Sequence, residues 1–429
     1  MRRILVGLLG VATIAGLGGL WLAHRAPRAL PDSATRRDQA IAYLETALAR
    51  DPDNPLLKGQ LINRLVLRFA QEADLSDLVR GEALAAIAIT LASDRSAALA
   101  RWSGLQLMQH KFQAAFENAE RAVDADPGSA EARGVLLEAA LAAGHYRIAD
   151  REAARIAPGT VAGQVRRATW LDAQGKTETA LQLMERACRE LERIGAEPDV
   201  VGWCLTRTAA LVHAVRGPAE AKRLLHRVTT IRPGYRGAVE GLATLALAEG
   251  EIETAVAGFR AIVSDAHPDL YLRLAEALRL AGLPDSAAAA ERKFLAIAAI
   301  PGNEALFGHP LSLYHAERAD REGLDAALAV AEREVARRPT TESFDLLAWV
   351  HYRRGELERA AAAAERALDW GAPSPTMLYH RGRIFEGLGR ISEGRRMIEA
   401  ATAVPTLLAP HARLDWSRTR DESSRRRPA

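Results

Sequence analysis

The stretch TESFDLLAWVHYRRGELERAAAAAERALDWGAPS (residues 341–374) predicts a pair of packed helices. Its apolar residues recur at helical spacing on both sides of Gly355, which indicates two amphipathic helices joined by a turn. Glycine suits that turn because it adopts left-handed backbone dihedrals without a Cβ clash. Small residues at Ala360 and Ala364 let the second helix approach the first closely, so the stretch predicts a compact helical hairpin.

The same pattern returns along the chain. Residues 236–267 and 268–294 repeat it, with turn glycines at Gly250 and Gly282. Most intervals between equivalent small residues lie near the ~34-residue period of a helix-turn-helix repeat, and longer intervals at 67–80, 188–202 and 295–309 predict insertions. The equivalent small residues are Ala40, Ala83, Ala115, Ala149, Ala180, Ala221, Ala255, Ala287, Ala327, Ala360 and Gly394.

This pattern resembles the tetratricopeptide repeat family, and the resemblance covers nearly all of residues 36–404. It implies an all-α, right-handed superhelical solenoid of about ten helix-turn-helix repeats after an initial half-repeat. In that family the first helices line a concave groove that binds peptides. We therefore predict three regions: a membrane anchor or signal sequence at 1–30, the solenoid at 36–404, and a basic, disordered tail at 405–429.

The N-terminal region contains an uncharged run at residues 4–23, which is long enough to cross a bilayer as a helix. Cleavage after Ala23 or Ala26 would put Trp21 or His24 at the minus-three position, where a small residue is needed, which favours an uncleaved anchor over a cleaved signal peptide. The order of charge and then apolar run favours an inner-membrane protein with its bulk in the periplasm. The cytoplasmic face of the membrane, or secretion after cleavage, are the alternatives.

The net charge of the chain is +3, and both ends are basic, so the body between them is slightly acidic. A surface that binds nucleic acid needs clustered positive charge. We therefore predict no nucleic-acid partner. This counts against one hypothesis for the function, a single-stranded RNA binder of the helical-repeat type.

Sequence motifs for catalysis are absent: the chain has no Walker A, GxSxG, HExxH or CxxC sequence. We predict that it is not an enzyme and has no cofactor or metal. His315, His351 and His380 lie in the three C-terminal repeats and are interpreted as core histidines. The alternative is that they form a small-ligand or metal site in a subunit of an enzyme complex.

Aromatic and charged residues gather on the predicted groove of the last repeats. Aromatic and arginine side chains are enriched at interaction hot spots, so we predict a partner-binding site there, in which Trp349→Ala or Tyr352→Ala weakens binding and leaves helicity intact. The alternative is a structural cluster that packs on the basic tail or on neighbouring repeats. The predicted site residues are Asp345, Trp349, Tyr352, Arg353, Tyr379, Arg383 and Glu386.

The two cysteines, Cys188 and Cys204, lie at equal distances from a predicted turn near Ala196. On two antiparallel helices that symmetry can bring them together, so we hypothesise a disulfide in an oxidising compartment. Two independent buried thiols are the alternative.

The segment Asp345–Trp349, with Tyr379, His380 and Gly382, resembles the C-terminal part of bacterial envelope-associated tetratricopeptide proteins. The leading hypothesis is a membrane-tethered scaffold for protein–protein interaction, in envelope assembly, secretion or polysaccharide export. Its partners would be a protein or peptide in the groove and the membrane through residues 4–23, and self-association is left open.

Overall fold

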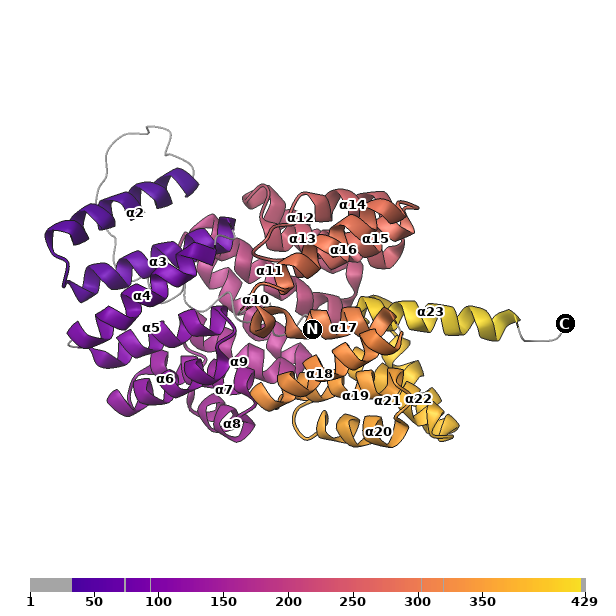
Figure 1. Cartoon of the computed structure of the whole chain (residues 1–429). Coiled ribbons are helices and arrows are strands. Elements are labelled where there is room, and N and C mark those ends of the chain that lie inside the picture. The colour runs from indigo at the N-terminus through magenta and orange to yellow at the C-terminus, as the bar shows by residue number, and fades with distance from the viewer. Residues whose placement is uncertain (1–32, 73–74, 93, 302, 319, 426–429) are drawn as a thin grey trace.

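The structure is a computed structural model that describes residues 33–72, 75–92, 94–301, 303–318 and 320–425. Within these ranges the chain is helical and contains no β-strand. One isolated β-bridge joins Ser264 and His267. One helix, α2 (Ser33–Arg50), precedes a series of helix pairs in which each helix packs against the next along the chain. Figure 1 shows the array curving from α2 to α22.

Ten helical hairpins follow α2 in the described part of the chain. Their first helices are α3 (Pro55–Glu72), α5 (Arg95–Met108), α7 (Ala130–Ala143), α9 (Val161–Ala173), α11 (Pro198–Arg216), α13 (Arg236–Glu249), α15 (Asp269–Leu280), α17 (Glu304–Arg318), α19 (Thr341–Arg353) and α21 (Pro375–Gly387). Their second helices are α4 (Leu75–Leu91), α6 (Phe112–Ala125), α8 (Tyr146–Arg155), α10 (Thr177–Arg193), α12 (Pro218–Ile231), α14 (Ile252–Arg260), α16 (Pro284–Ala298), α18 (Arg321–Arg337), α20 (Leu357–Arg366) and α22 (Ile391–Thr402). The prediction of an all-α array of about ten hairpins after a half-repeat is confirmed.

The repeat positions read from the sequence are the points where the helices of a hairpin meet. Ala149, Ala255 and Ala360 are completely buried, which lets two backbones approach. The predicted turn glycines have left-handed dihedrals, with φ of 83° at Gly250 and 76° at Gly355. A small buried residue at the helix crossing and a glycine in the turn therefore form each of these hairpins in the same way.

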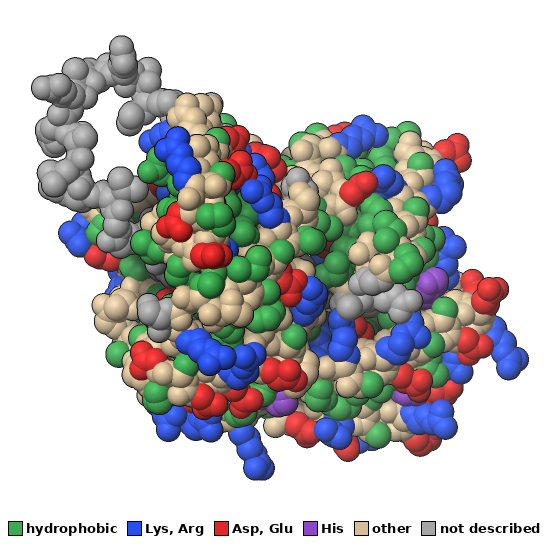
Figure 2. Space-filling model, turned by 60° about the vertical axis from the view of Figure 1, so that its left-hand side comes forward, with side chains coloured by type: hydrophobic (Ala, Val, Ile, Leu, Met, Phe, Trp, Pro, Cys, Tyr) green, Lys and Arg blue, Asp and Glu red, His purple; other side chains and the backbone are tan. Residues whose placement is uncertain are grey.

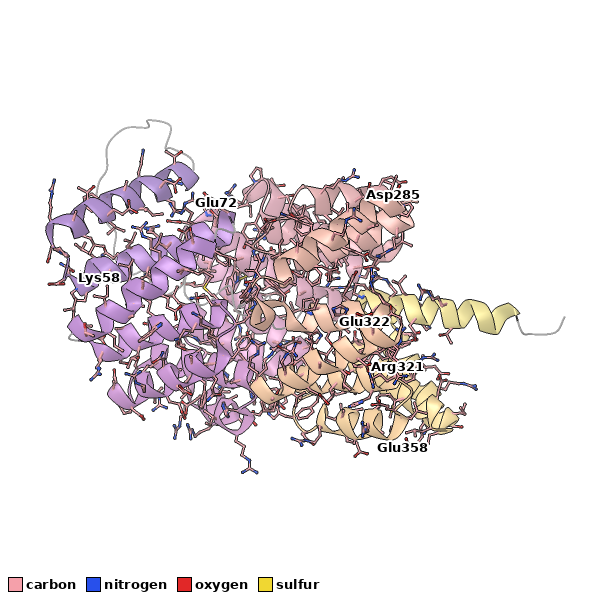
Figure 3. The ribbon with its side chains drawn as sticks, viewed as in Figure 1. Lys58, Glu72, Asp285, Arg321, Glu322 and Glu358 are labelled. Carbon is pink, nitrogen blue, oxygen red and sulfur yellow. A yellow bond between two sulfur atoms is a disulfide. The ribbon has the colours of Figure 1, made fainter. Side chains whose placement is uncertain are left out.

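Eight of the ten described second helices, all except α6 and α8, carry an acidic residue in their first turn, where a negative charge stabilises the positive end of the helix dipole. Figure 3 labels three of them: Asp285 in α16, Glu322 in α18 and Glu358 in α20. This charge placement fits helices that begin at the exposed side of each turn.

The array closes on itself through contacts between α8 and the segments on either side of α19 and α20. The rings of Tyr146 and Trp370 stack with centroids 4.2 Å apart. The Tyr146 hydroxyl accepts a hydrogen bond of 2.8 Å from the backbone N–H of Thr341. Trp370 Nε1 donates to the carboxylate of Asp150, 220 residues away along the chain, at 3.1 and 3.2 Å. We call Tyr146, Asp150, Thr341 and Trp370 the clasp.

Two parts of the array meet at the clasp, one containing Tyr146 and Asp150 and the other Thr341 and Trp370, and we call them the two arms. Glycines allow the arms to approach each other closely beside the clasp. At Gly371, where φ is 74°, an added Cβ would lie 2.6 Å from the carbonyl oxygen of Ala173. The neighbouring backbone N–H of Ala372 donates to that same oxygen at 2.9 Å. At Gly144, an added Cβ would lie 2.8 Å from the Pro339 carbonyl oxygen. Any side chain at these two glycines would push the arms apart.

The C-terminal segment differs from its prediction. Residues 405–425 do not form a disordered tail: they form a short 3₁₀ helix, η1 (Pro405–Leu407), and a helix, α23 (Pro410–Arg425). The segment is held because the Ala409 N–H donates to Thr376 Oγ1 at 2.9 Å, and because Leu408 and Ala412 are buried. Figure 1 shows that the far end of α23 projects away from the body of the array.

The structure contradicts the predicted inner-membrane location. Within residues 33–72, 75–92, 94–301, 303–318 and 320–425, no helix combines the length and the apolar character that a bilayer crossing requires. The predicted span at 4–23, and the anchor or signal region 1–30 that contains it, lie outside the described residues.

Candidate functional site

The residues predicted to bind a partner lie together, and α23 covers them. Trp349 and Tyr379 are only 0% and 1% exposed. The Tyr379 hydroxyl donates to Asp415 of α23 at 2.7 Å, and Arg383 Nε donates to the same carboxylate at 3.1 Å. The chain's own C-terminal helix therefore occupies the surface that the sequence assigned to a partner.

Trp349 is the centre of this cluster. Its indole N–H donates to Glu317 at 3.1 Å, and Arg353 forms an ion pair with the same carboxylate at 2.8 Å. Its ring stacks on His380, with centroids 4.2 Å apart, and on Tyr352, with centroids 5.0 Å apart. A side chain with these contacts on several sides is part of the core in this conformation.

The remaining predicted residues also have internal partners. Arg383 donates to Glu386 at 3.0 Å, and Asp345 accepts from His380 at 3.0 Å. The arrangement matches the alternative interpretation, a cluster that packs on the C-terminal segment. A role in partner binding stays a prediction for these residues, and it requires α23 to leave.

A chain of buried polar groups connects α19, α21 and α23. His380 Nδ1 faces the Asp345 carboxylate, and His380 Nε2 lies 2.9 Å from His411 Nε2. One ring must donate and the other accept, so the two rings share a single proton between them. Burial lowers the pKa of His411 well below its ordinary value, and the nearby His380 and His309 act in the same direction.

Acid should therefore weaken the docking of α23. Because the pKa of His411 is lower in the folded than in the unfolded state, its stabilising contribution is present above about pH 6.5 and is lost as the pH falls below it. We expect a lower Tm at about pH 5.5 than at about pH 7.5, and a smaller difference in His411→Gln. Thermal unfolding followed by circular dichroism measures both. An identical pH dependence in the variant would contradict this role of His411.

The three histidines of the alternative hypothesis do not converge. His351 Nδ1 lies 2.6 Å from Glu356, His315 packs edge-on against Tyr314, and His380 bonds to Asp345. Across the described ranges, no group of three or more His, Cys, Asp or Glu side chains is placed to hold a metal ion. The hypothesis of a site built from these three histidines loses its geometric basis.

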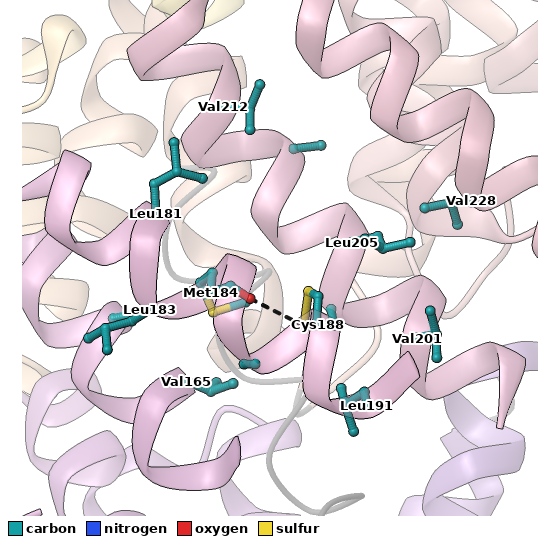
Figure 4. Close-up of a cluster of buried hydrophobic side chains, with 14 of the residues drawn as sticks. Val165, Leu181, Leu183, Met184, Cys188, Leu191, Val201, Leu205, Val212 and Val228 are labelled. Carbon is teal, nitrogen blue, oxygen red and sulfur yellow. Dashed lines mark hydrogen bonds between the residues drawn. A yellow bond between two sulfur atoms is a disulfide. The ribbon is translucent and has the colours of Figure 1, made fainter. Parts of the chain in front are cut away.

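Cys188 and Cys204 face each other across α10 and α11, with their Cα atoms 5.6 Å apart and their sulfurs bonded. Both are buried in an apolar cluster that includes Leu181 and Leu205 (Figure 4). A separation of this size is typical of disulfides. The pairing in the cell remains a prediction, with its test in the Discussion.

The inner side of the array borders a central cavity of about 280 Å³ that is open to solvent. Its wall is formed by first helices from α7 to α21, together with η1 and α23, and three clasp residues, Tyr146, Thr341 and Trp370, border it. Apolar residues such as Leu141 and Leu313 alternate there with charged ones. The charged residues of its wall include Glu138, Asp172, Arg207, Arg273, Glu342, Asp345 and Arg413.

The charges of the central cavity are largely compensated. Glu138 accepts from Arg166 at 3.1 Å, and burial raises the pKa of Glu138 to about 7 against the opposing effect of Arg166. Arg413 of α23 lies 3.5 Å from Glu276. The cavity thus offers polar groups of both signs within an apolar wall, the general character of binding sites in proteins.

Sequence reasoning missed the contributions of α23. His411 and Asp415 touch the cluster from a segment whose arginine content predicted disorder. The signal that could have found them is apolar: Leu408 and Ala412 are buried, and Trp416 packs beside them. Ala412 and Trp416, four residues apart, lie on one face of α23, and Leu408 packs with them from the segment just before that helix.

The hairpins, their stacking and the inner cavity define a tetratricopeptide-like helical-repeat protein. No protein-family model and no curated protein sequence matches the chain. Among solved structures, a human IFIT1 dimer with PPP-AAAA is 15% identical, with 86% of this chain and 94% of that chain covered and a TM-score of 0.45. An IFIT1 monomeric mutant with Gppp-AAAA is 14% identical over 78% and 76% of the two chains, with a TM-score of 0.47. PilF of Pseudomonas aeruginosa is 16% identical over 49% and 96%, with a TM-score of 0.36.

Proposed function

We propose that the protein is a non-catalytic scaffold that binds an extended segment of a partner protein in the central cavity. The observation that carries the proposal is the cavity itself, an open hollow bordered by successive first helices and lined by apolar and charged groups. An extended peptide has backbone donors and acceptors along its whole length, and its side chains can enter the apolar parts of such a wall.

A peptide suits this cavity better than a nucleic acid. The wall mixes arginines with the carboxyl groups of Asp172, Glu342 and Asp345, so it lacks the clustered positive charge that a phosphate backbone requires. On the outside, Figure 2 shows acidic and basic side chains interspersed over the visible face, without a continuous basic surface. The envelope pathways suggested by the sequence resemblance remain the place to look for the partner.

A cavity-filling variant tests the proposal. Ala210 of α11 lines the cavity, whereas Val215 of the same helix is 36% exposed and does not. Peptides selected from a random library on the wild-type protein should bind Ala210→Trp at least about tenfold more weakly, because the indole fills the cavity, and should bind the control Val215→Trp normally. Affinities are measured by fluorescence anisotropy.

Two results would count against the proposal. Equal affinity of the selected peptides for the wild type and Ala210→Trp would place binding outside the cavity. In the same assay, tight binding of a single-stranded RNA oligonucleotide that Ala210→Trp abolishes would replace the peptide by a nucleic acid.

A further inference from the structure

A second cavity of about 210 Å³ adjoins the central one, and we call it the side cavity. It lies between α11, the beginning of α13 and the segment before α15, with Leu67 and Ala70 of α3 closing one side. Arg207 and Ala210 line both cavities. What distinguishes the side cavity is that several buried polar atoms of its lining residues lack a hydrogen-bond partner.

Buried polar atoms without a hydrogen-bond partner converge on the side cavity. Such atoms are rare in folded proteins because a desolvated donor or acceptor lowers stability when it stays unpaired. Half of the ten unpartnered side-chain atoms in the described residues line this one cavity. They are Asp199 Oδ2, Trp203 Nε1, Thr206 Oγ1, Arg236 Nη1 and His267 Nε2.

One wall of the side cavity is a single face of α11. Asp199, Trp203 and Thr206 are spaced by four and three residues, so their side chains lie on the same side of the helix. The side chain of Asp199 is only 7% exposed, and its Oδ1 accepts from Arg232 at 3.0 Å. Its other oxygen therefore remains for a donor that enters the cavity.

The other walls of the side cavity carry the two remaining unpartnered side chains, Arg236 and His267. Arg236 is the first residue of α13, and a Cβ on the next residue, Gly237, would lie 3.4 Å from Thr206 Cγ2, so α11 and the start of α13 are in contact. The ring of His267 lies against Phe69 of α3, with centroids 6.0 Å apart. Donors and acceptors thus face one small space from three directions.

The charges of the side cavity are of both signs. Arg207 and Arg236 line it together with Asp199, Glu240 and Asp269. Two guanidinium groups and three carboxyl groups leave the wall close to electrically neutral, and burial raises the pKa of Asp269. A neutral wall with separate donors and acceptors favours a ligand that carries both charges over one that carries only one.

The atoms also dictate the polarity of each part of the ligand. An indole N–H and a guanidinium can only donate, so Trp203 and Arg236 require an acceptor such as a carboxylate. An ionised carboxylate can only accept, so Asp199 Oδ2 requires a donor such as an ammonium group. Thr206 and His267 can serve either part.

We propose that the side cavity binds a small zwitterion of the amino-acid type, with its carboxylate at Arg236 and Trp203 and its ammonium group at Asp199. This site is additional to the peptide-binding function of the central cavity and does not depend on it. The cavity volume admits a compact molecule, and the apolar neighbours Leu225, Leu245 and Leu270 can receive a side chain.

The binding test uses the purified full chain and the standard L-amino acids, each added singly. We expect one or more of them to raise the Tm and to show a measurable Kd by calorimetry, because a ligand that binds only the folded state stabilises it. Trp203→Phe and Asp199→Asn should each weaken that binding about tenfold to a hundredfold. Trp102→Phe is the matched control, because the Trp102 indole donates to Glu82 outside the cavity.

The contrary outcomes are equally definite. If no amino acid changes the Tm or gives heat of binding, the proposal is overturned. It is also overturned if the two cavity variants bind as the wild type does, or if acetate alone binds as tightly as the amino acid. Far-ultraviolet circular dichroism of each variant shows whether it is folded, so that lost binding is not confused with lost structure.

A second variant pair tests the site without any ligand. Thr206 Oγ1 is unpartnered, whereas Thr208 Oγ1, two residues along α11, donates to the Cys204 carbonyl at 2.9 Å. Thr206→Val should therefore raise the Tm of the free protein, while Thr208→Val should lower it. An equal fall in both would mean that Thr206 already has a partner in solution, and the proposal would fail at this wall.

Discussion

Replacement of Trp349 by alanine should lower the free energy of unfolding by about 3–5 kcal/mol. The side chain is completely buried, and it stacks on His380 and Tyr352 beneath α23. Its removal leaves a large void and also leaves Glu317 without the indole donor. The sequence predicted weaker partner binding with intact helicity; the burial adds an expected loss of stability, and the effect on binding stays a prediction.

Urea unfolding followed by circular dichroism measures this effect. Tyr43→Ala is the matched control, because Tyr43 is 71% exposed and its truncation should change the free energy of unfolding by no more than about 0.5 kcal/mol. If Trp349→Ala cost as little as the control, Trp349 would be accessible in solution and α23 would not be docked on it. A partner site at Trp349 and Tyr379 would then regain its support.

Simultaneous replacement of Cys188 and Cys204 by alanine should lower the free energy of unfolding by about 3 kcal/mol under oxidising conditions. A bridge over a sequence separation of 16 residues restricts the unfolded chain, and both sulfurs also pack in the apolar cluster of α10 and α11. Urea unfolding of the wild type with and without a reductant separates the contribution of the bond from that of packing.

The existence of the bond is tested first, by alkylation and mass measurement of the native protein without reductant. No alkylated thiol is expected. Two alkylated thiols would contradict the disulfide, and the double alanine variant should then lose only the packing contribution, with no effect of reductant on the wild type.

The hairpin array could be predicted because its rules are local. A turn glycine such as Gly355 and a crossing alanine such as Ala360 depend on residues within one repeat, and recurrence along the chain multiplies a weak signal. The structure places these residues in the turn and at the crossing where the pattern put them.

The site could not be predicted to the same extent because it depends on contacts between distant parts of the chain. The composition of residues 405–429 indicated disorder, yet a few apolar positions such as Leu408 suffice to dock α23 when Trp349 and Tyr379 offer a surface. The side cavity needs α3, α11 and the start of α13 together, and nothing in a single repeat reveals that arrangement. Only the spacing of Asp199, Trp203 and Thr206 was visible in the sequence.

The clasp has a consequence for how this chain can change in evolution. Open repeat arrays lengthen or shorten by whole repeats, since each repeat contacts only its neighbours. Here Asp150 and Trp370 must meet across 220 residues of chain. Gain or loss of one hairpin between them would shift the two arms relative to each other and separate the clasp residues. Hairpins before α8 or after α21 are not under this constraint. Homologous chains that keep the clasp should therefore share one number of repeats between Asp150 and Trp370 and vary in length only towards their ends.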